Sequence, residues 1–404
     1  MKRHLLFLYF LLPATILCAQ QTGTTKNYFP PAGKWEKQAP GSSGFDQDKL
    51  GDAIRFAISN ESRNPRSMEL NHARTFAKEP FGEAIGPFAD RGDATGIIVH
   101  KGYIVAEWGE PSRVDMTHSV TKSFLSAVVG LAVDKGLIKN VNDTVAKYAF
   151  SFKRYDSVKL PSSAADLSLM HPFESPHNQE VTWESMLRQT SDWEGTLWDK
   201  PEWADRPDKD STKWHNRIRN KPGAVFEYND VRVNALALAA TLVWRKSLPE
   251  VLKKNIMDLI GASGSWKWEG YRNSWIVLDG KRVQSVSGGG HWGGGMFINA
   301  YDMARFGLLT LHKGNWNGKQ LISKKWIDQS LTPTPDNPEY GYMNFFLNTD
   351  KKYFPAAPAT AFVHVGNGTN IIYVDTEHDL VVVVRWIENG AVKEMVKKVL
   401  EALK

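Results

Sequence analysis

The chain has 404 residues, of which 42% are hydrophobic and 23% are charged, and these fractions exclude a disordered, collagen-like or coiled-coil protein. The net charge of +6 comes from scattered lysine and arginine residues with no basic run, which argues against a nucleic-acid-binding protein. The single cysteine, Cys18, excludes an intramolecular disulfide and a cysteine-based zinc cluster.

Residues 1–19 are typical of an export signal peptide. They open with the basic letters KRH and continue with an apolar run too short to span a bilayer. Cleavage after Ala19 would leave a soluble, periplasmic or secreted chain, because no later apolar run approaches membrane-spanning length. Two alternatives are a lipid anchor on Cys18, which the bulky Leu17 disfavours, and a buried N-terminal helix.

The first half of the mature chain contains a leader, a hairpin and several helices. Residues 20–45 are rich in Gly, Pro, Ser, Thr and Gln and predict a flexible leader. Residues 95–108 hold two β-rich runs around Lys101-Gly102, which predicts a β-hairpin. Apolar residues at helical spacing then predict helices over 119–138, 181–193, 229–245 and 250–260.

The last third of the chain has a different pattern. Residues 288–295 (GGGHWGGG) form a glycine-rich loop, and helices are predicted over 301–312 and 323–331. Three strand-like runs separated by turns predict a β-meander at 361–365, 370–374 and 380–386. An amphipathic helix over 391–404 closes the chain.

This order of elements predicts a mixed α/β fold of the α+β type, an antiparallel β-sheet flanked by helices. The sheet lobe is expected to comprise residues 46–115 and 265–404. Residues 116–264 are expected to form an inserted all-helical lobe. The two lobes together would make one catalytic unit.

The first chemical motif is Ser119-Val120-Thr121-Lys122, at the start of a predicted helix. Residues three apart share a helix face, so the Lys122 amine can reach the Ser119 hydroxyl. A serine hydroxyl needs a neighbouring base to become a nucleophile, and a lysine serves only if its surroundings keep it neutral. The alternative is that Ser119 caps the helix and Lys122 is solvated.

The second motif is the stretch PGAVFEYND, which ends at Asp230. Tyr228 could shuttle a proton, and Asp230 could hold Lys122 by charge or by a hydrogen bond. The alternative is a helix cap, in which Asn229 or Asp230 opens the helix and Tyr228 packs beneath it.

The third motif is His364-Val365-Gly366-Asn367, at the end of a predicted strand. A glycine there would let a substrate approach the backbone, and the next N–H could point at an oxyanion. The alternative is a hairpin turn with an exposed histidine.

The three motifs together resemble the serine β-lactamase-like superfamily, which includes class C β-lactamases, penicillin-binding-protein-like peptidases and related esterases. The family signatures are Ser-x-x-Lys, Tyr-x-Asn and Lys/His-Thr/Ser-Gly, and the corresponding segments fall here in family order as SVTK, YND and HVG. The resemblance covers roughly residues 90–400. It implies the fold predicted above and covalent catalysis of acyl transfer.

Carried over to this chain, the resemblance makes Ser119 the acylated nucleophile and Lys122 its activating partner. Tyr228 would protonate the leaving group and later assist water. The backbone N–H groups of Ser119 and Asn367 would form the oxyanion hole, and His364 would take the place of the third-motif lysine.

Two departures from the family pattern bear on the substrate. Asp230 stands where the family usually has asparagine, which adds a negative charge and removes a donor. His364 replaces the lysine whose fixed positive charge faces the substrate carboxylate in true β-lactamases, and a neutral histidine does not supply that charge. Both changes favour an ester or amide substrate over a β-lactam.

Further aromatic residues are candidates for the substrate pocket. Trp193 and Trp198 lie in the tryptophan-rich stretch 189–207, which in the family falls near the mouth of the site. His291 and Trp292 in the glycine-rich loop could line its floor. The alternative in both cases is that these residues pack the interior.

The sequence therefore predicts an exported serine hydrolase that cleaves a small-molecule or short-peptide ester or amide. No metal motif and no nucleotide-binding loop is present, so neither a metal nor another cofactor is expected. The alternatives are a peptidase or weak β-lactamase acting on cell-wall peptides, and a catalytically silent binding protein of the same fold.

Overall fold

The computed structural model describes residues 27–155, 168–215 and 217–404. The predicted signal peptide over residues 1–19, including Cys18 and the cleavage point at Ala19, lies outside the described residues.

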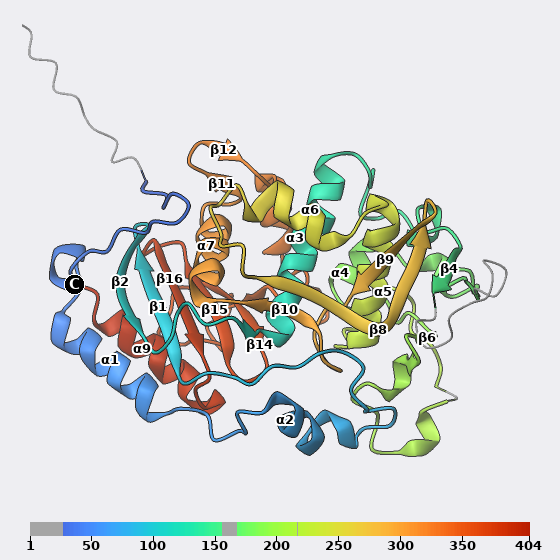
Figure 1. Ribbon diagram of the computed structural model, residues 1–404, viewed down its shortest axis with the longest axis horizontal. Coiled ribbons are helices and arrows are strands. Elements are labelled where there is room, and N and C mark those ends of the chain that lie inside the picture. The colour runs from blue at the N-terminus through green and yellow to red at the C-terminus, as the bar shows by residue number, and fades with distance from the viewer. Residues whose placement is uncertain (1–26, 156–167, 216) are drawn as a thin grey trace, which may run out of the picture.

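A six-stranded antiparallel sheet joins the two ends of the described chain (Figure 1). Its strands, in spatial order, are β13 (Phe346–Leu347), β14 (Phe362–Gly366), β15 (Asn370–Asp375), β16 (Leu380–Arg385), β1 (Thr95–His100) and β2 (Tyr103–Trp108). β1 pairs with β16, so the predicted hairpin and the predicted meander, both confirmed, belong to one sheet.

Helices cover both faces of this sheet. Side chains alternate along β1: Ile97 and Val99 face one apolar cluster, and Ile98 faces the other. On the first face lies α7 (Ala300–Leu311), and on the second face lie α1 (Gln47–Ser59) and α9 (Val392–Glu401) (Figure 1). The expected antiparallel sheet flanked by helices is therefore confirmed.

A second sheet extends away from the first. Its path runs β3 (Asp115–Met116), β10 (Gly295–Ile298), β8 (Lys267–Leu278), β4 (Phe152–Tyr155) and β5 (Leu169–Met170), and β9 (Lys281–Val286) pairs with β8. The hairpin of β8 and β9 is not among the predicted elements. Polar residues interrupt its period-two pattern, and the register shifts between Gly270 and Trp275.

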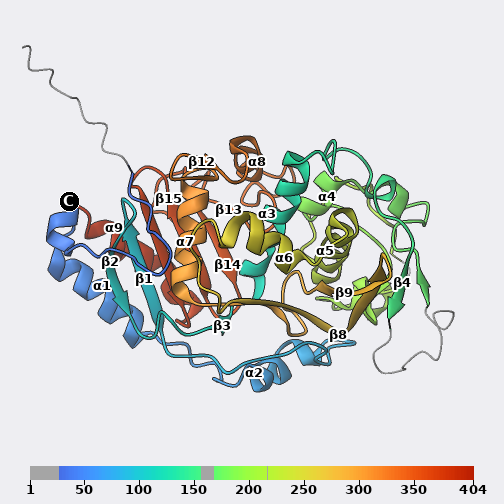
Figure 2. The same ribbon diagram turned by 45° about the horizontal axis from the view of Figure 1, so that its top comes forward.

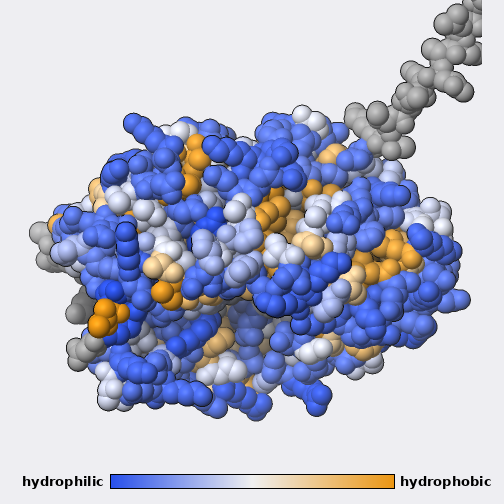
Figure 3. All heavy atoms as spheres, turned by 180° about the vertical axis from the view of Figure 1, so that it is seen from behind, coloured by the Kyte–Doolittle hydropathy of each residue, from blue (hydrophilic) through white to orange (hydrophobic). Residues whose placement is uncertain are grey.

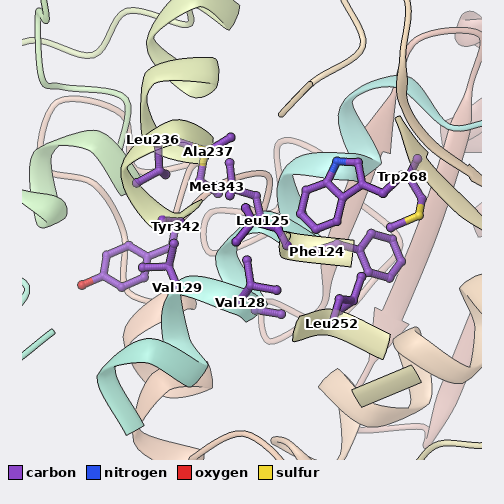
Figure 4. Packing of buried hydrophobic residues seen from close by; sticks show 14 of the residues in the cluster. Phe124, Leu125, Val128, Val129, Leu236, Ala237, Leu252, Trp268, Tyr342 and Met343 are labelled. Atoms are coloured by element: carbon purple, nitrogen blue, oxygen red, sulfur yellow. The ribbon is translucent and has the colours of Figure 1, made fainter. Parts of the chain in front are cut away.

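Four helices pack beside the second sheet (Figure 2). They are α3 (Thr121–Asp134), α4 (Trp183–Leu187), α5 (Asp230–Trp244) and α6 (Leu248–Leu252). A π-helical turn, η9 (Lys253–Met257), extends α6. α3 is buried over almost its whole length. Phe124, Leu125 and Val128 of α3 meet Leu236 of α5 and Leu252 of α6 (Figure 4). The first helical residues after Ser119 are therefore held in the core.

One predicted helix is much shorter than expected. The 181–193 segment forms only α4, which opens with a capping box between Thr182 and Ser185. Gln189 and Asp192 then take positive φ values, which end the helix and turn the chain toward α5. The other predicted helices are confirmed, with ends that differ by a few residues.

The remaining elements are short. They are α2 (Met68–Arg74), α8 (Lys324–Ser330), β6 (Thr196–Leu197), β7 (Lys200–Pro201), β11 (Asn315–Trp316), β12 (Lys319–Gln320), and 3-10 turns that include η3 (His118–Val120) and η10 (Asn389–Ala391). The described part of the leader, 27–45, is fixed to the body: Trp35 Nε1 donates to Gly102 O at 2.8 Å, and Arg305 donates to Pro30 O and Pro31 O. Residues 27–45 are therefore held by hydrogen bonds to the rest of the protein, whereas the sequence predicts a flexible leader there.

The face seen from behind is mostly hydrophilic, with hydrophobic residues in small separate groups (Figure 3). In the described part of the chain, no helix combines the length and the apolar character needed to cross a bilayer.

Candidate active site

The two sheets meet at the turn that carries Ser119. Thr117 N donates to Met296 O at 2.9 Å, and Met296 N donates to Thr121 Oγ1 at 2.9 Å, so β10 holds the chain on both sides of Ser119. His118, the residue before the serine, has a φ of 49°, an uncommon value for a residue other than glycine. Ser119 therefore lies on η3, at a sharp turn fixed by its neighbours, and not inside a regular helix.

Gly366 brings β14 against the same turn. A Cβ atom at this position would lie 1.9 Å from Thr117 O and 3.2 Å from Val120 N. The glycine is thus required by the close approach of strand and turn, a different reason from the substrate contact expected from the sequence. The approach brings Asn367 and Ser119 into the wall of the same cleft.

Lys122 and Ser119 are in direct contact, as their spacing predicts. Lys122 Nζ donates to Ser119 Oγ at 2.8 Å and to Asp230 Oδ1 at 2.5 Å. The Lys122 side chain is fully buried. A buried ammonium group is costly unless it is paired, and Asp230 supplies the pairing charge.

Helix α5 places Asp230. Asn229 caps the helix by accepting from Arg232 N at 3.1 Å, so Asp230 is free to reach Lys122. The cap and the Lys122 contact, considered as alternatives from the sequence, are therefore both present, on adjacent residues.

Tyr228 lies against the same lysine. Lys122 Nζ lies 4.7 Å from the centre of the Tyr228 ring, and Arg206 Cζ lies 5.0 Å from it. Burial, together with the negative charge of Asp230, raises the pKa of Tyr228 above its ordinary value, while Arg206 and a hydrogen bond with Ser119 oppose the rise. The phenol is therefore neutral at rest and available as a proton donor.

Arg206 is a second cation of the site that the sequence gave no reason to select. Its Nη1 donates to Asp205 Oδ1 at 2.5 Å and to Asp230 Oδ2 at 3.0 Å. Burial would raise the pKa of Asp230, but Lys122 and Arg206 hold it well below its usual range. Asp230 therefore stays ionised between two cations. A loop residue with no motif spacing carries no sequence signal for such a contact.

His291 extends this network behind the catalytic candidates. Its Nε2 contacts Glu79 Oε2 at 2.8 Å, and its Nδ1 lies 3.6 Å from Asp230 Oδ2. Burial alone would lower the pKa of His291, but Asp205, Asp230 and Glu79 raise it to about 9. His291 is thus a buried cation, and it does not line the cleft at Ser119.

Glu79, Asp205 and His291 place their donor atoms within 4.8 Å of one another, a spacing that a metal ion could occupy. Two observations fit an ion-pair network better. Asp205 is already bound by Arg206, and a protonated imidazole has no lone pair to offer a metal. The network contains three carboxylates and three cations. The carboxylates are Glu79, Asp205 and Asp230, and the cations are Lys122, Arg206 and His291.

The glycine-rich loop closes over the pair of Lys122 and Asp230. A Cβ atom at Gly289 would lie 1.9 Å from Asp230 Oδ1 and 2.3 Å from Lys122 Nζ. Only a glycine lets the backbone cover the pair so closely. The loop therefore excludes water from the buried side of the site.

Ser119 opens into a cleft of about 390 Å³. The side chains and backbone that line it are those of Ser62, Asn64, Phe76, Ser119, Arg206, Tyr228, Phe346, Val365, Gly366, Asn367, Gly368, Thr369, Ile387, Glu388 and Asn389. At least three other cavities in the described part of the chain exceed it in volume, so its candidacy rests on its chemistry and not on its size.

His364 does not face this cleft. Its ring is fully buried among Phe306, Phe345 and Phe362, and its Nδ1 lies 2.9 Å from Ser123 Oγ. Burial lowers the pKa of His364 to about 3, so the ring is neutral. Side chains alternate along β14, so Val365 faces the cleft and His364 faces the core. The alternative prediction, a hairpin turn with an exposed histidine, is wrong because His364 is buried.

The tryptophans predicted for the pocket lie elsewhere. Trp198 and Trp292 are core residues. Trp193 donates from Nε1 to Pro172 O at 2.7 Å and lines a second cavity, of about 500 Å³, whose walls do not include Ser119. Trp198 and Trp292 therefore follow the interior-packing alternative, and Trp193 lies at a different cavity from Ser119. The aromatic residues of the cleft are instead Phe76, Tyr228 and Phe346.

A family model for beta-lactamase matches residues 83–397 of the chain. This protein belongs to the beta-lactamase family. The match includes Ser119, Lys122, Tyr228 and the β14 motif, so the superfamily resemblance inferred from the three motifs is confirmed. The comparison with curated proteins found no match.

Solved structures with the same fold are distant in sequence. A family VIII carboxylesterase is 17% identical, with a TM-score of 0.53, over 91% of this chain and 98% of that one. A penicillin-binding protein homologue from Caulobacter crescentus is 14% identical, with a TM-score of 0.52, over 89% and 99%. A hydrolase with promiscuous acyltransferase activity is 11% identical, with a TM-score of 0.51, over 88% and 98%. At these identities the likeness shows the fold alone.

Proposed function

We propose that this beta-lactamase-family protein is an exported serine hydrolase that cleaves an ester or amide through an acyl-enzyme on Ser119. The observation that carries the proposal is the contact of Lys122 Nζ with both Ser119 Oγ and the ionised Asp230, beside Tyr228 and open to a cleft. A serine with a buried amine and a phenol at hand has the parts that nucleophilic catalysis needs.

In the first step, Ser119 Oγ forms a bond to the carbonyl carbon of the substrate. Lys122, reacting as the neutral amine, takes the proton of Ser119. The ammonium group that forms is paired with the ionised Asp230, while the negative charge develops on the substrate oxygen. The total charge of the site is unchanged. The backbone N–H groups of Ser119 and Asn367 would stabilise the oxyanion, since both residues line the cleft.

In the second step, the bond to the leaving group breaks and Tyr228 donates the proton that this group needs. The phenolate then recovers a proton from the Lys122 ammonium group, which returns to the amine. Water then attacks the carbonyl carbon of the acyl-enzyme and gives a proton to Lys122 or Tyr228. The bond to Ser119 Oγ breaks, Oγ takes a proton back from these groups, and the acid product leaves.

An ester or amide is favoured over a β-lactam by the placement of His364. The neutral, buried ring offers no charge to a substrate carboxylate. Arg206 is the one lysine or arginine among the described residues that line the cleft, and two carboxylates already bind it. The carboxylesterase and acyltransferase among the structural neighbours have the same fold.

The test measures hydrolysis of p-nitrophenyl butyrate and of nitrocefin by the chain from residue 20 onward and by its Ser119→Ala variant. We expect ester turnover that falls at least about a thousandfold in Ser119→Ala, with little nitrocefin turnover. Ser42→Ala, which changes an exposed serine bonded only to Ala39 O, is the matched control. Fast nitrocefin hydrolysis would favour the β-lactamase alternative, and ester turnover unchanged in Ser119→Ala would exclude the proposed nucleophile.

Export rests on the sequence of residues 1–19, with its basic start and short apolar run. N-terminal sequencing of protein recovered outside the cytoplasm should begin at Gln20. A retained N-terminus with a lipid on Cys18 would point to the anchored alternative.

A further inference from the structure

The cleft has an unusual balance of charge. Arg206, the cation that lines the cleft, is paired from the buried side with both Asp230 and Asp205, and Lys122, which lies behind the cleft, is paired with Asp230. A group held by two carboxylates in this way attracts an external anion weakly.

Glu388 is the one acidic residue among the described residues that line the cleft. It follows β16 on the sheet lobe and exposes 37% of its side chain. Its backbone is anchored, because Glu388 N donates to Asn60 O at 2.8 Å and Glu388 O accepts from Ala391 N at 2.9 Å. The carboxylate is therefore presented to the cleft from a fixed point.

The partner of Glu388 does not cancel its charge. Arg63 N donates to Glu388 Oε1 at 2.7 Å, and Arg63 Nε lies 3.5 Å from the same oxygen. The Arg63 side chain is 92% exposed, and such surface ion pairs are weak. Within the described residues, the contacts of Arg63 with the Glu388 carboxylate are to Oε1, and no hydrogen bond joins Oε2 to the protein.

The polar and apolar parts of the cleft fit a substrate with one charged end. Ser62, Asn64 and Asn389 line the cleft together with Glu388 and offer further oxygen atoms, whereas Phe76, Phe346 and Ile387 supply apolar wall. Ammonium groups are recognised by a carboxylate together with neutral oxygens and aromatic faces.

We propose that the cleft selects ester or amide substrates that carry a positively charged ammonium group, and that Glu388 binds this group. The inference rests on the proposed function and names the substrate class of the same site. It also accounts for the departure from the family pattern at Asp230, since the charges that would attract a substrate carboxylate are neutralised here.

The test uses two matched pairs of substrates that differ in charge but not in shape. On the leaving-group side, butyrylcholine is compared with 3,3-dimethylbutyl butyrate. On the acyl side, the p-nitrophenyl ester of 4-(trimethylammonio)butyrate is compared with that of 5,5-dimethylhexanoate. Mono-p-nitrophenyl adipate is the anionic counterpart. The readout is the ratio of kcat/KM between charged and neutral members, with spontaneous hydrolysis subtracted.

We expect the cationic member of at least one pair to be preferred about threefold to tenfold, and this preference to disappear in Glu388→Gln. Glu377→Gln, an exposed glutamate bonded to Thr360 and outside the cleft, should keep the wild-type ratio. Thermal unfolding of each variant checks that it is folded.

Two results would overturn the inference: ratios near one in both pairs, or faster turnover of the adipate monoester than of the neutral ester, which would mean that Arg206 dominates. Either result leaves the Ser119-dependent hydrolysis intact. Loss of Ser119-dependent turnover for every ester would instead remove the proposed function itself.

Discussion

The phenol of Tyr228 lies between two cations and above the pair formed by Lys122 and Asp230. Arg206 and a hydrogen bond with Ser119 favour the phenolate that appears when Tyr228 gives its proton away, whereas burial and Asp230 disfavour it. In the resting protein, burial and Asp230 have the larger effect on the Tyr228 pKa. Tyr228 therefore keeps its proton and is suited to donate it when the leaving group needs one.

Tyr228→Phe removes this proton while keeping the ring and its contacts with the two cations. We expect kcat for ethyl butyrate, whose ethoxide leaving group needs a proton, to fall by about a hundredfold or more, with little change in thermal stability. Tyr353→Phe, a matched change at a partly buried tyrosine outside the cleft lining, should retain activity. Near-normal turnover in Tyr228→Phe would assign the proton steps to Lys122 alone.

At the residue scale, the sequence predicted the contacts made through fixed spacing. Ser119 lies on the 3-10 turn η3 that leads into α3, and Lys122 lies three residues later in the first turn of α3, so helical spacing predicts their contact. Local spacing does not predict that His364 points into the core or that Arg206 contacts Asp230. Each depends on which face of a strand or loop the whole fold buries. Long-range burial has no signature in a local pattern.

At the element scale, the site depends on strand β14 approaching η3 within backbone contact. Gly366→Ala would place a Cβ atom 1.9 Å from Thr117 O and push the strand away from the serine turn. We expect unfolding to become easier by about 2 kcal/mol and kcat/KM to fall by more than tenfold, since Asn367 would move with the strand.

The matched control for Gly366→Ala is Gly390→Ala, where an added Cβ meets nothing within 4 Å. Denaturant unfolding and ester hydrolysis of both variants make the comparison. Equal stability and activity in the two variants would contradict the account of how β14 positions the site.

Elements with a clear pattern of apolar residues could be predicted from the sequence. Elements whose form depends on contacts with distant segments could not. The meander of β14, β15 and β16 consists of nearly continuous apolar runs between turn residues, and it is present as expected. The hairpin of β8 and β9 lacks such a run, because β4 and α5 cover only part of it. The 181–193 helix stops early because Gln189 and Asp192 take positive φ values.

At the scale of the whole molecule, buried histidines tie stability to pH. Burial lowers the pKa of His364 to about 3, whereas an unfolded histidine titrates near 6.5. Between these values the unfolded state binds a proton that the folded state refuses, so stability is lost as the pH falls below about 6.5.

His364→Gln should therefore reduce the slope of unfolding free energy against pH by on the order of 1 kcal/mol per pH unit between pH 6 and 4. Denaturant titrations at several pH values provide the measurement. His378→Gln, at a partly exposed histidine paired with Asp375, is the comparison and should change that slope less. An unchanged slope in His364→Gln would mean that His364 is not neutral in the folded protein.

The central claim is that Ser119 carries the acyl group. The most direct measurement is mass spectrometry of the protein quenched in acid during turnover of p-nitrophenyl butyrate, followed by peptide mapping. We predict one butyryl group on the peptide that contains Ser119, absent from Ser119→Ala and increased in Tyr228→Phe if deacylation is slowed. A butyryl group on another residue, or turnover without any acylated protein under conditions where release of p-nitrophenol shows a burst, would contradict the account.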